Sequence, residues 1–195
     1  MDPRASAFVQ AHFPQHVSGL HDYRGQDTVL VKREGLLEVL QFLKADPSAA
    51  FDFLMDLTCV DYLRFGHTQH SAPRLATPSP LPYFMDAQPS AERWERGASN
   101  DTHRFELVYH LYATTRQHRL RVKVPLPASD PVADSATGLW EAANWFEREI
   151  WDMFGVRFTG HPNLKRLLLY EAFQGHPLRK DYPVNKRQPL IGPSY

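Results

Sequence analysis

The chain has a single cysteine, Cys59, among 195 residues. One thiol cannot close an internal disulfide, so we expect a fold that does not depend on an oxidising compartment. One thiol also falls short of the four that an iron–sulfur cluster usually takes. No stretch approaches the roughly 20 apolar residues that span a bilayer, and residues 1–10 lack the apolar core of a signal peptide. We therefore expect membrane contact only through a partner.

An excess of charge of either sign is also missing, because 22 basic residues balance 22 acidic ones. A neutral chain gives no whole-molecule attraction for nucleic acid. The sequence also lacks a glycine-rich phosphate loop and a dinucleotide fingerprint. A metal site could be assembled on paper from the side chains of Cys59, Asp152, His161, His176 and Asp181, but none of these residues has a metal-ligand spacing such as Cys-x-x-Cys.

Periodic apolar residues predict a compact domain followed by an extended tail. Helical spacing appears at 5–13 and 36–43, and strand-like patterns appear at 17–23, 28–32, 51–57, 105–111 and 120–126. In the third of these strands we expect an inward-facing row of Phe51, Phe53, Met55 and Leu57. The element order predicts a two-layer α+β domain over residues 1–160, with helices on one face of a mostly antiparallel or mixed sheet of about five strands.

Two proline-rich stretches interrupt this pattern. Residues 66–102 contain five prolines and little periodicity, which predicts a long surface loop inserted in the domain. Residues 161–195 again contain repeated prolines and predict an extended tail with at most one short helix, near 164–173. The tail is also basic. It is either a solvated or internally paired surface, a partner-binding arm or, less simply, a nucleic-acid-binding segment.

The segment that ends at Phe154 contains more candidate functional side chains than any other part of the sequence. Asp134 or Ser135 could cap a helix there, and Gly155 would follow its end. Glu147 falls inside the apolar arc of this helix, so we expect a buried anion held by a tail cation, Arg166 first and Arg157 second. A second set of side chains lies away from that arc: Arg148 and Asp152, which are spaced to pair, and Glu149, which points nearly opposite to Glu147.

At this point the residues resemble a known family. The run from Glu147 to Gly155, then His161-Pro162, then Arg166-Leu167-Leu168 is similar to the signature of the thirty-kilodalton subunit of respiratory complex I. The closing stretch 173–183 resembles the same family's tail. The positions that carry the signature are Glu147, Arg148, Glu149, Asp152, Gly155, His161, Pro162 and Arg166. The positions that match the family's partner-binding tail are Gly175, His176, Pro177, Arg179, Lys180, Asp181, Tyr182 and Pro183.

The resemblance implies a non-catalytic member of the peripheral arm of a proton-translocating NADH:quinone oxidoreductase. Such a member has no cofactor of its own, while NADH, FMN, iron–sulfur clusters and quinone bind to other subunits. Its implied partners are the subunit that helps form the quinone site, which we call the quinone-site subunit, and the neighbouring iron–sulfur subunits. All of these lie on the cytoplasmic side of the inner cell membrane. The equivalent component of a membrane-bound hydrogenase or another dehydrogenase is the alternative within the family.

Two alternatives from other classes remain. One is a free-standing metal-dependent enzyme that uses His161, His176 and Asp181. The other is a nucleic-acid-binding protein that uses the basic tail. Neither explains why the charged and proline positions of 145–183 follow the family pattern so closely.

Overall fold

The computed structural model describes residues 5–63 and 103–189. The described elements, in chain order, are α1 Ala5–His12, β1 Val17–Tyr23, β2 Gln26–Val31, the 3-10 turn η1 Arg33–Gly35, α2 Leu36–Ala45, β3 Phe53–Asp61, β4 Phe105–Ala113, β5 His118–Leu126, β6 Val132–Asp134, α3 Ala143–Phe154 and β7 Arg157–Thr159. Within these ranges, none of the helices is long and apolar enough to cross a membrane.

The main sheet has five strands in the order β1-β2-β5-β4-β3. Three neighbouring pairs are antiparallel, and the β2–β5 pair is parallel. Strands β4 and β5, both predicted from the sequence, form an antiparallel hairpin, with Phe105 opposite Leu126 and Ala113 opposite His118. A small parallel pair, β6–β7, lies apart from this sheet. The predicted α+β fold with a mixed sheet is thus confirmed.

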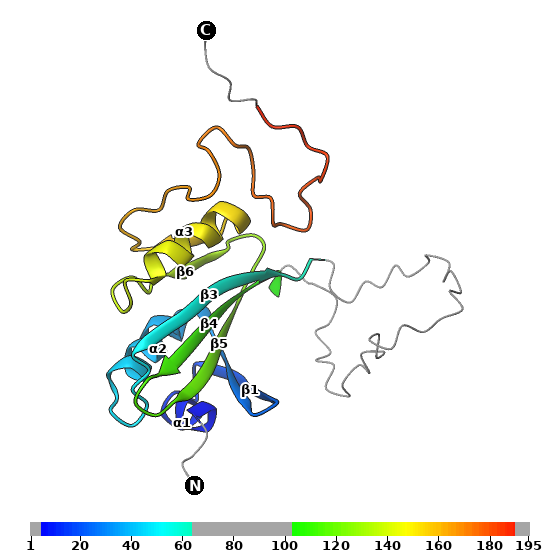
Figure 1. The fold of residues 1–195 in the computed structure, drawn as a ribbon. Coiled ribbons are helices and arrows are strands. Elements are labelled where there is room, and N and C mark those ends of the chain that lie inside the picture. Colours follow the sequence, from blue (N-terminus) through cyan, green and yellow to red (C-terminus); the bar gives the residue numbers. More distant parts are fainter. Residues whose placement is uncertain (1–4, 64–102, 190–195) are drawn as a thin grey trace, which may run out of the picture.

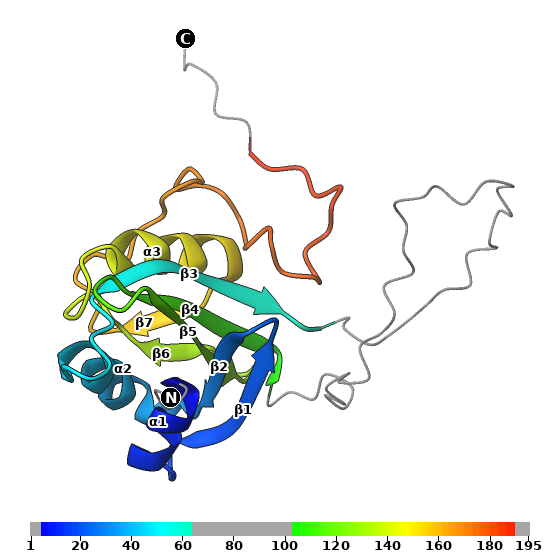
Figure 2. The same cartoon turned by 60° about the horizontal axis from the view of Figure 1, so that its bottom comes forward.

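One face of the sheet carries the core. Alternate residues of β4 and β5 point into it, and side chains from all three helices join the same buried cluster. Phe8 of α1 and Phe42 of α2 stack with ring centroids 5.5 Å apart, and the two helices are neighbours in Figure 2. The described helices thus lie on one face of the sheet, as the sequence predicted, and none of the described residues forms a helix on the opposite face.

Strand β3 corrects the predicted inward row. Phe53 is 51% exposed and Met55 38% exposed, whereas Leu54 and Leu57 are buried. The cause is a bulge between Leu54 and Asp56, where the pairing with β4 shifts by one residue. A bulge breaks the two-residue alternation, so Phe53 and Met55 face outward although their spacing from Leu57 predicted the opposite.

Helix α3 also differs from its prediction at the start. It begins at Ala143, because Asp134 ends β6 and the chain turns repeatedly before the helix. Its end is as predicted, since Gly155 adopts a left-handed conformation with φ of 74°. The prediction of at most one short helix, near 164–173, agrees with the structure, because the described residues 160–189 contain only turns, bends and backbone without regular secondary structure. The predicted insertion at 66–102 lies outside the described residues.

We predict that replacing residues 66–102 by a short Gly/Ser turn leaves the domain folded. The strands on either side are antiparallel neighbours, and Tyr62 N–H donates to Arg104 O at 2.8 Å. A short turn can therefore join them, and closing a shorter loop costs less entropy. The circular dichroism spectrum and a cooperative melting transition check this. A variant without a cooperative transition would show that the segment supplies part of the core.

Candidate functional site

The signature residues gather around the carboxylate of Asp152, whose side chain is fully buried on α3. Its Oδ2 accepts the backbone N–H groups of three successive residues, Leu167 at 3.0 Å, Leu168 at 2.9 Å and Leu169 at 2.9 Å. Its Oδ1 accepts the Arg166 guanidinium at 2.6 Å. One carboxylate on the helix thus holds a whole turn of the C-terminal segment, which passes along α3 in Figure 1.

Arg166 extends this attachment further along the chain. Its Nη2 donates to the carbonyls of Phe173 at 2.9 Å and Gly175 at 3.4 Å. Its guanidinium also lies over the Trp151 ring, 5.6 Å from the centroid. Burial alone would raise the pKa of Asp152, but the N–H groups and Arg166 outweigh it and the pKa is lowered. The carboxylate is therefore held in its charged form.

These contacts correct both predicted ion pairs. Arg166 pairs with Asp152 rather than with Glu147. Arg148 does not pair with Asp152 but donates to the carbonyls of Lys165 at 3.2 Å and Arg166 at 3.1 Å. The physical reason is that the tail supplies donors to Asp152 and carbonyl acceptors to Arg148, neither of which the helix alone provides. Glu149 is exposed on the same helix.

Glu147 is fully buried, as predicted, but neutral groups surround it. Its Oε1 accepts the Ala136 N–H at 2.7 Å, and its Oε2 accepts the Ser135 hydroxyl at 2.7 Å. Ser135 is in turn 2.8 Å from the Thr137 hydroxyl. Burial raises the pKa of Glu147 to about 7, and the two hydrogen bonds only partly oppose it. The predicted pairing with Arg166 or Arg157 is wrong, since Arg157 bonds to Asp130 instead.

The end of α3 binds a second part of the tail. A helix terminus leaves its last carbonyls without partners within the helix. Here the Asp152 carbonyl accepts His176 Nδ1–H at 3.0 Å, the Met153 carbonyl accepts Leu178 N–H at 3.1 Å, and the Phe154 carbonyl accepts Arg179 Nε–H. The tail therefore completes the hydrogen bonding of the helix end.

Gly155 makes this approach possible. Its φ is in the left-handed region, which favours glycine. A Cβ built there would lie 2.4 Å from the Arg179 guanidinium and 2.6 Å from the His176 ring. The signature glycine is thus explained both by the helix ending and by the close passage of the tail.

A third attachment was missed at the sequence level. The buried carboxylate of Asp61, at the end of β3, accepts Arg104 through two nitrogens at 3.2 and 3.0 Å and the Lys180 N–H at 2.9 Å. Arg104 also pairs with Asp181 at 2.8 Å. The available signal was an aspartate that ends a strand at an inward-facing position. Together the three attachments show that the proline-rich segment is paired with its own domain up to Asp181.

The other singled-out residues have structural roles around these attachments. His161, beside Pro162, donates from Nε2 to Asn144 O at 3.3 Å and accepts the Asn163 N–H on Nδ1 at 3.0 Å. Tyr182, before Pro183, stacks on Phe173, with ring centroids 6.2 Å apart. Gly175 has φ of 96°, and Pro177 is half-buried.

The described residues do not assemble the metal site that was possible on paper. Within 5–63 and 103–189, no group of three or more His, Cys, Asp or Glu side chains is placed to hold a metal ion. Cys59 is buried in β3, and burial raises the pKa of its thiol. His161, His176, Asp152 and Asp181 each bond to protein groups instead.

What the arrangement leaves available is a set of exposed apolar side chains. Leu168 and Leu178 are exposed on the anchored segment, Val184 is exposed after it, and Trp145 is exposed on α3. Large exposed apolar side chains on an ordered surface are typical of a binding site for another protein. These exposed apolar side chains thus indicate a surface that binds another protein.

We predict that Asp152→Asn strongly destabilises the domain. The amide keeps the shape, but it removes the charge that compensates the partly buried Arg166. Breaking such a pair typically lowers the free energy of unfolding by about 3 kcal/mol. Glu149→Gln, an exposed neutralisation on the same helix, is the matched control and should change it by less than about 0.5 kcal/mol. Denaturant unfolding of both variants checks this, and equal stability of the two would contradict the anchoring role.

We predict that Glu147→Gln stabilises the domain at pH 8 and changes little at pH 4.5. Because the folded-state pKa is raised to about 7, the folded state binds more protons than the unfolded state between pH 4.5 and 7. Wild-type stability therefore falls across that window, by roughly 2–3 kcal/mol in all. Glutamine can keep both hydrogen bonds without the charge. Unfolding curves from pH 4.5 to 8 check this, and a less stable variant at pH 8 would indicate a cation beside Glu147.

Comparison with known proteins agrees with this architecture. Residues 29–188 match the family described as respiratory-chain NADH dehydrogenase, 30 Kd subunit. A NADH-quinone oxidoreductase subunit of Citrifermentans bemidjiense is 38% identical over 191 residues, covering 97% of this chain and 95% of that protein. The protein of the same name from Legionella pneumophila (strain Corby) is 37% identical, covering 91% of this chain and 75% of that one.

Two solved structures share the fold. The trypsin-resistant fragment (1–134) of Nqo5 has a TM-score of 0.55 and 28% identity, covering 81% of this chain and 96% of the fragment. A chain of the archaeal membrane-bound sulfane sulfur reductase has a TM-score of 0.58 over 92% of this chain, but at 19% identity it shows the fold alone. The family match over most of the sequence decides the question: the chain belongs to the 30-kilodalton subunit family of respiratory-chain NADH dehydrogenase.

Proposed function

We propose that this chain is the 30-kilodalton subunit of a proton-translocating NADH:quinone oxidoreductase, without a cofactor of its own. It binds beside the quinone-site subunit and the neighbouring iron–sulfur subunits in the peripheral arm, on the cytoplasmic side of the inner cell membrane. Electrons pass from NADH through FMN and iron–sulfur clusters to quinone in those other subunits. The role of this chain is to give the arm its shape and to support its assembly.

The observation that carries the proposal is the anchored segment with its outward apolar side chains. Asp152, the end of α3 and Asp61 fix the backbone of 166–181, while Leu168 and Leu178 remain exposed on it. Ordering the segment in advance reduces the entropy lost when a partner binds. The names of the relatives support a partner from the NADH-quinone oxidoreductase complex.

The part of the tail after Asp181 fits a clamp on the partner better than the part before it. Residues 183–187 are exposed, and Val184 has its whole side chain in water. Prolines at 183 and 189 favour extended backbone there. Gln188 and Pro189 bond back to Gln174 and Tyr170. We therefore assign to the anchored portion the ordering of exposed side chains, and to the exposed residues 183–187 the contact with the quinone-site subunit.

An equivalent component of another membrane-bound complex is the second candidate. Its support is the fold shared with the sulfane sulfur reductase chain. Sequence identity of 35–38% to several NADH-quinone oxidoreductase subunits favours the first candidate.

We predict that Leu178→Asp combined with Val184→Asp leaves the isolated chain stable but impairs assembly. Both side chains are exposed, so their loss should change the free energy of unfolding by less than about 0.5 kcal/mol each. A charge placed in an apolar interface opposes binding. The measurement is the amount of tagged chain recovered with the membrane enzyme, together with NADH-driven quinone reduction by the membranes.

Leu37→Asp, an exposed leucine on α2, is the matched control and should assemble normally. Wild-type chain that does not co-purify with an NADH-oxidising complex would contradict the proposed function itself. Normal assembly of the double variant would contradict only the role of the tail. The purified chain alone should not oxidise NADH, and a cofactor-free sample that did so would contradict the cofactor assignment.

A further inference from the structure

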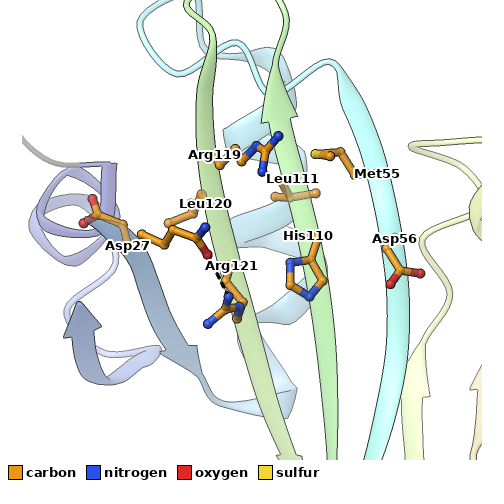
Figure 3. A pocket seen from close by; sticks show the side chains of 9 residues that line it. Asp27, Met55, Asp56, His110, Leu111, Arg119, Leu120 and Arg121 are labelled. Atoms are coloured by element: carbon orange, nitrogen blue, oxygen red, sulfur yellow. Dashed lines mark hydrogen bonds between the residues drawn. The ribbon is translucent and has the colours of Figure 1, made fainter. Parts of the chain in front are cut away.

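The face of the main sheet opposite the helices contains a hollow of about 330 Å³. Figure 3 shows this face with the side chains that line the hollow, which come from β2, β3, β4 and β5. Ordinary ligand pockets begin at about this size. The hollow is far from the tail attachments, because its lining residues lie at the opposite end of β3 from Asp61.

Two neighbouring rows of side chains define the chemistry of the hollow. In one row Asp56 lies opposite His110, and His110 lies opposite Arg121. In the next row Phe53, Tyr112 and Arg119 are paired in the same way. Arg119 and Arg121 are two residues apart on β5, so their side chains point to the same face about 7 Å apart.

Neither arginine has an acidic partner within the described ranges. Arg121 donates to the Gln26 side-chain oxygen at 3.1 Å, and the Arg119 guanidinium lies over the Tyr112 ring, 5.9 Å from its centroid. Lys123, next on the same face, differs because it pairs with Glu106 at 2.9 Å. The basic stripe on β5 is thus neutralised at one end and left without an anion at the other.

The two carboxylates near the hollow do not supply that anion. Asp27 is buried and accepts the Ser6 N–H of α1 at 3.3 Å, so it is directed to the helical side. Asp56 lies on β3, with His110 between it and Arg121 (Figure 3). Burial, followed by the charge of Arg121, lowers the pKa of His110. Two arginines, Arg119 and Arg121, thus face the single carboxylate of Asp56 at the hollow.

Apolar side chains border these two arginines. Phe53 and Met55, which the β3 bulge turns outward, are both exposed, and Tyr112 lies beside them. Arginine, methionine and aromatic residues are enriched at the centres of protein interfaces. Two free cations with a carboxylate nearby are too few for a nucleic-acid backbone, which takes a longer basic track. The composition favours a protein partner.

We propose that this hollow, which we call the β5 hollow, docks an acidic segment of a neighbouring subunit of the same complex. The segment carries two carboxylates about 7 Å apart, which pair with Arg119 and Arg121. An apolar side chain beside them packs on Phe53 and Met55. The inference rests on the proposed function, since it takes the partner from that complex. It defines an interface separate from the tail.

Cysteine labelling of the full chain tests the proposal. Met55→Cys places a thiol at the border of the hollow, and the native Cys59 is buried and should react little. We expect a maleimide to label the new thiol about tenfold more slowly in the assembled enzyme than in the isolated chain, which corresponds to about 1.4 kcal/mol of protection. A benzophenone attached there should cross-link to a peptide of another subunit that contains at least two Asp or Glu residues.

Charge variants made in the Met55→Cys background distinguish the contribution of the arginine charges to docking from the contribution of packing. Arg119→Glu with Arg121→Glu should abolish the protection or prevent assembly. Arg119→Lys with Arg121→Lys should preserve both. Arg116→Glu is the matched control on the same hairpin, where its side chain reaches the Pro47 carbonyl instead of the hollow, and it should behave as wild type.

Four results would overturn the inference. The first is equal labelling of Met55→Cys in the isolated chain and the assembled enzyme, and the second is protection that persists in the Arg119→Glu, Arg121→Glu variant. The third is loss of protection or assembly in the Arg119→Lys, Arg121→Lys variant. The fourth is a cross-link to this chain, to lipid or to a peptide without acidic residues. In each of these cases wild-type assembly can still be normal, so the proposed function would stand. A wild-type chain that does not assemble at all would instead contradict the proposed function.

Discussion

The carboxylate of Asp152 is the contact on which the C-terminal third of the structure depends. Four donors converge on it, three of them successive backbone N–H groups. A proline-rich segment cannot satisfy its backbone with a helix or a ladder of its own, so it needs an external acceptor. A charged acceptor makes each of these hydrogen bonds stronger than a neutral one would. Because Asp152 lies on α3 and α3 packs on the sheet, these hydrogen bonds set the position of the tail relative to both.

Two buried acids on the same helix show how donors decide ionisation. Asp152 meets four donors and its pKa is lowered, whereas Glu147 meets two neutral donors and its pKa rises to about 7. Burial opposes the charged form in both cases, so the difference comes from the number and charge of the hydrogen-bond partners. Protonated Glu147 can donate to Ser135, which can then donate to Thr137. The Ser135–Thr137 pair can thus accommodate either protonation state.

The sequence predicted elements well wherever a local pattern determines them. The β4–β5 hairpin, α2 and the Gly155 helix end follow from alternation, helical spacing and backbone conformation. It failed where the outcome depends on distant groups. The β3 bulge, which exposes Phe53 and Met55, arises from pairing with β4. The partner of Arg166 could not be chosen from helix geometry, because Glu147 and Asp152 are both acidic and only the path of the tail distinguishes them.

The end of α3 explains why the family signature continues beyond the helix into the tail. The last carbonyls of the helix accept His176, Leu178 and Arg179, and a side chain on residue 155 would close the space that these residues occupy. Arg179 also brings positive charge to the negative end of the helix dipole. Residues 20 or more positions apart are therefore constrained together by hydrogen bonds to one helix end. Because these bonds use the inner side of the tail, its outer side remains available for binding.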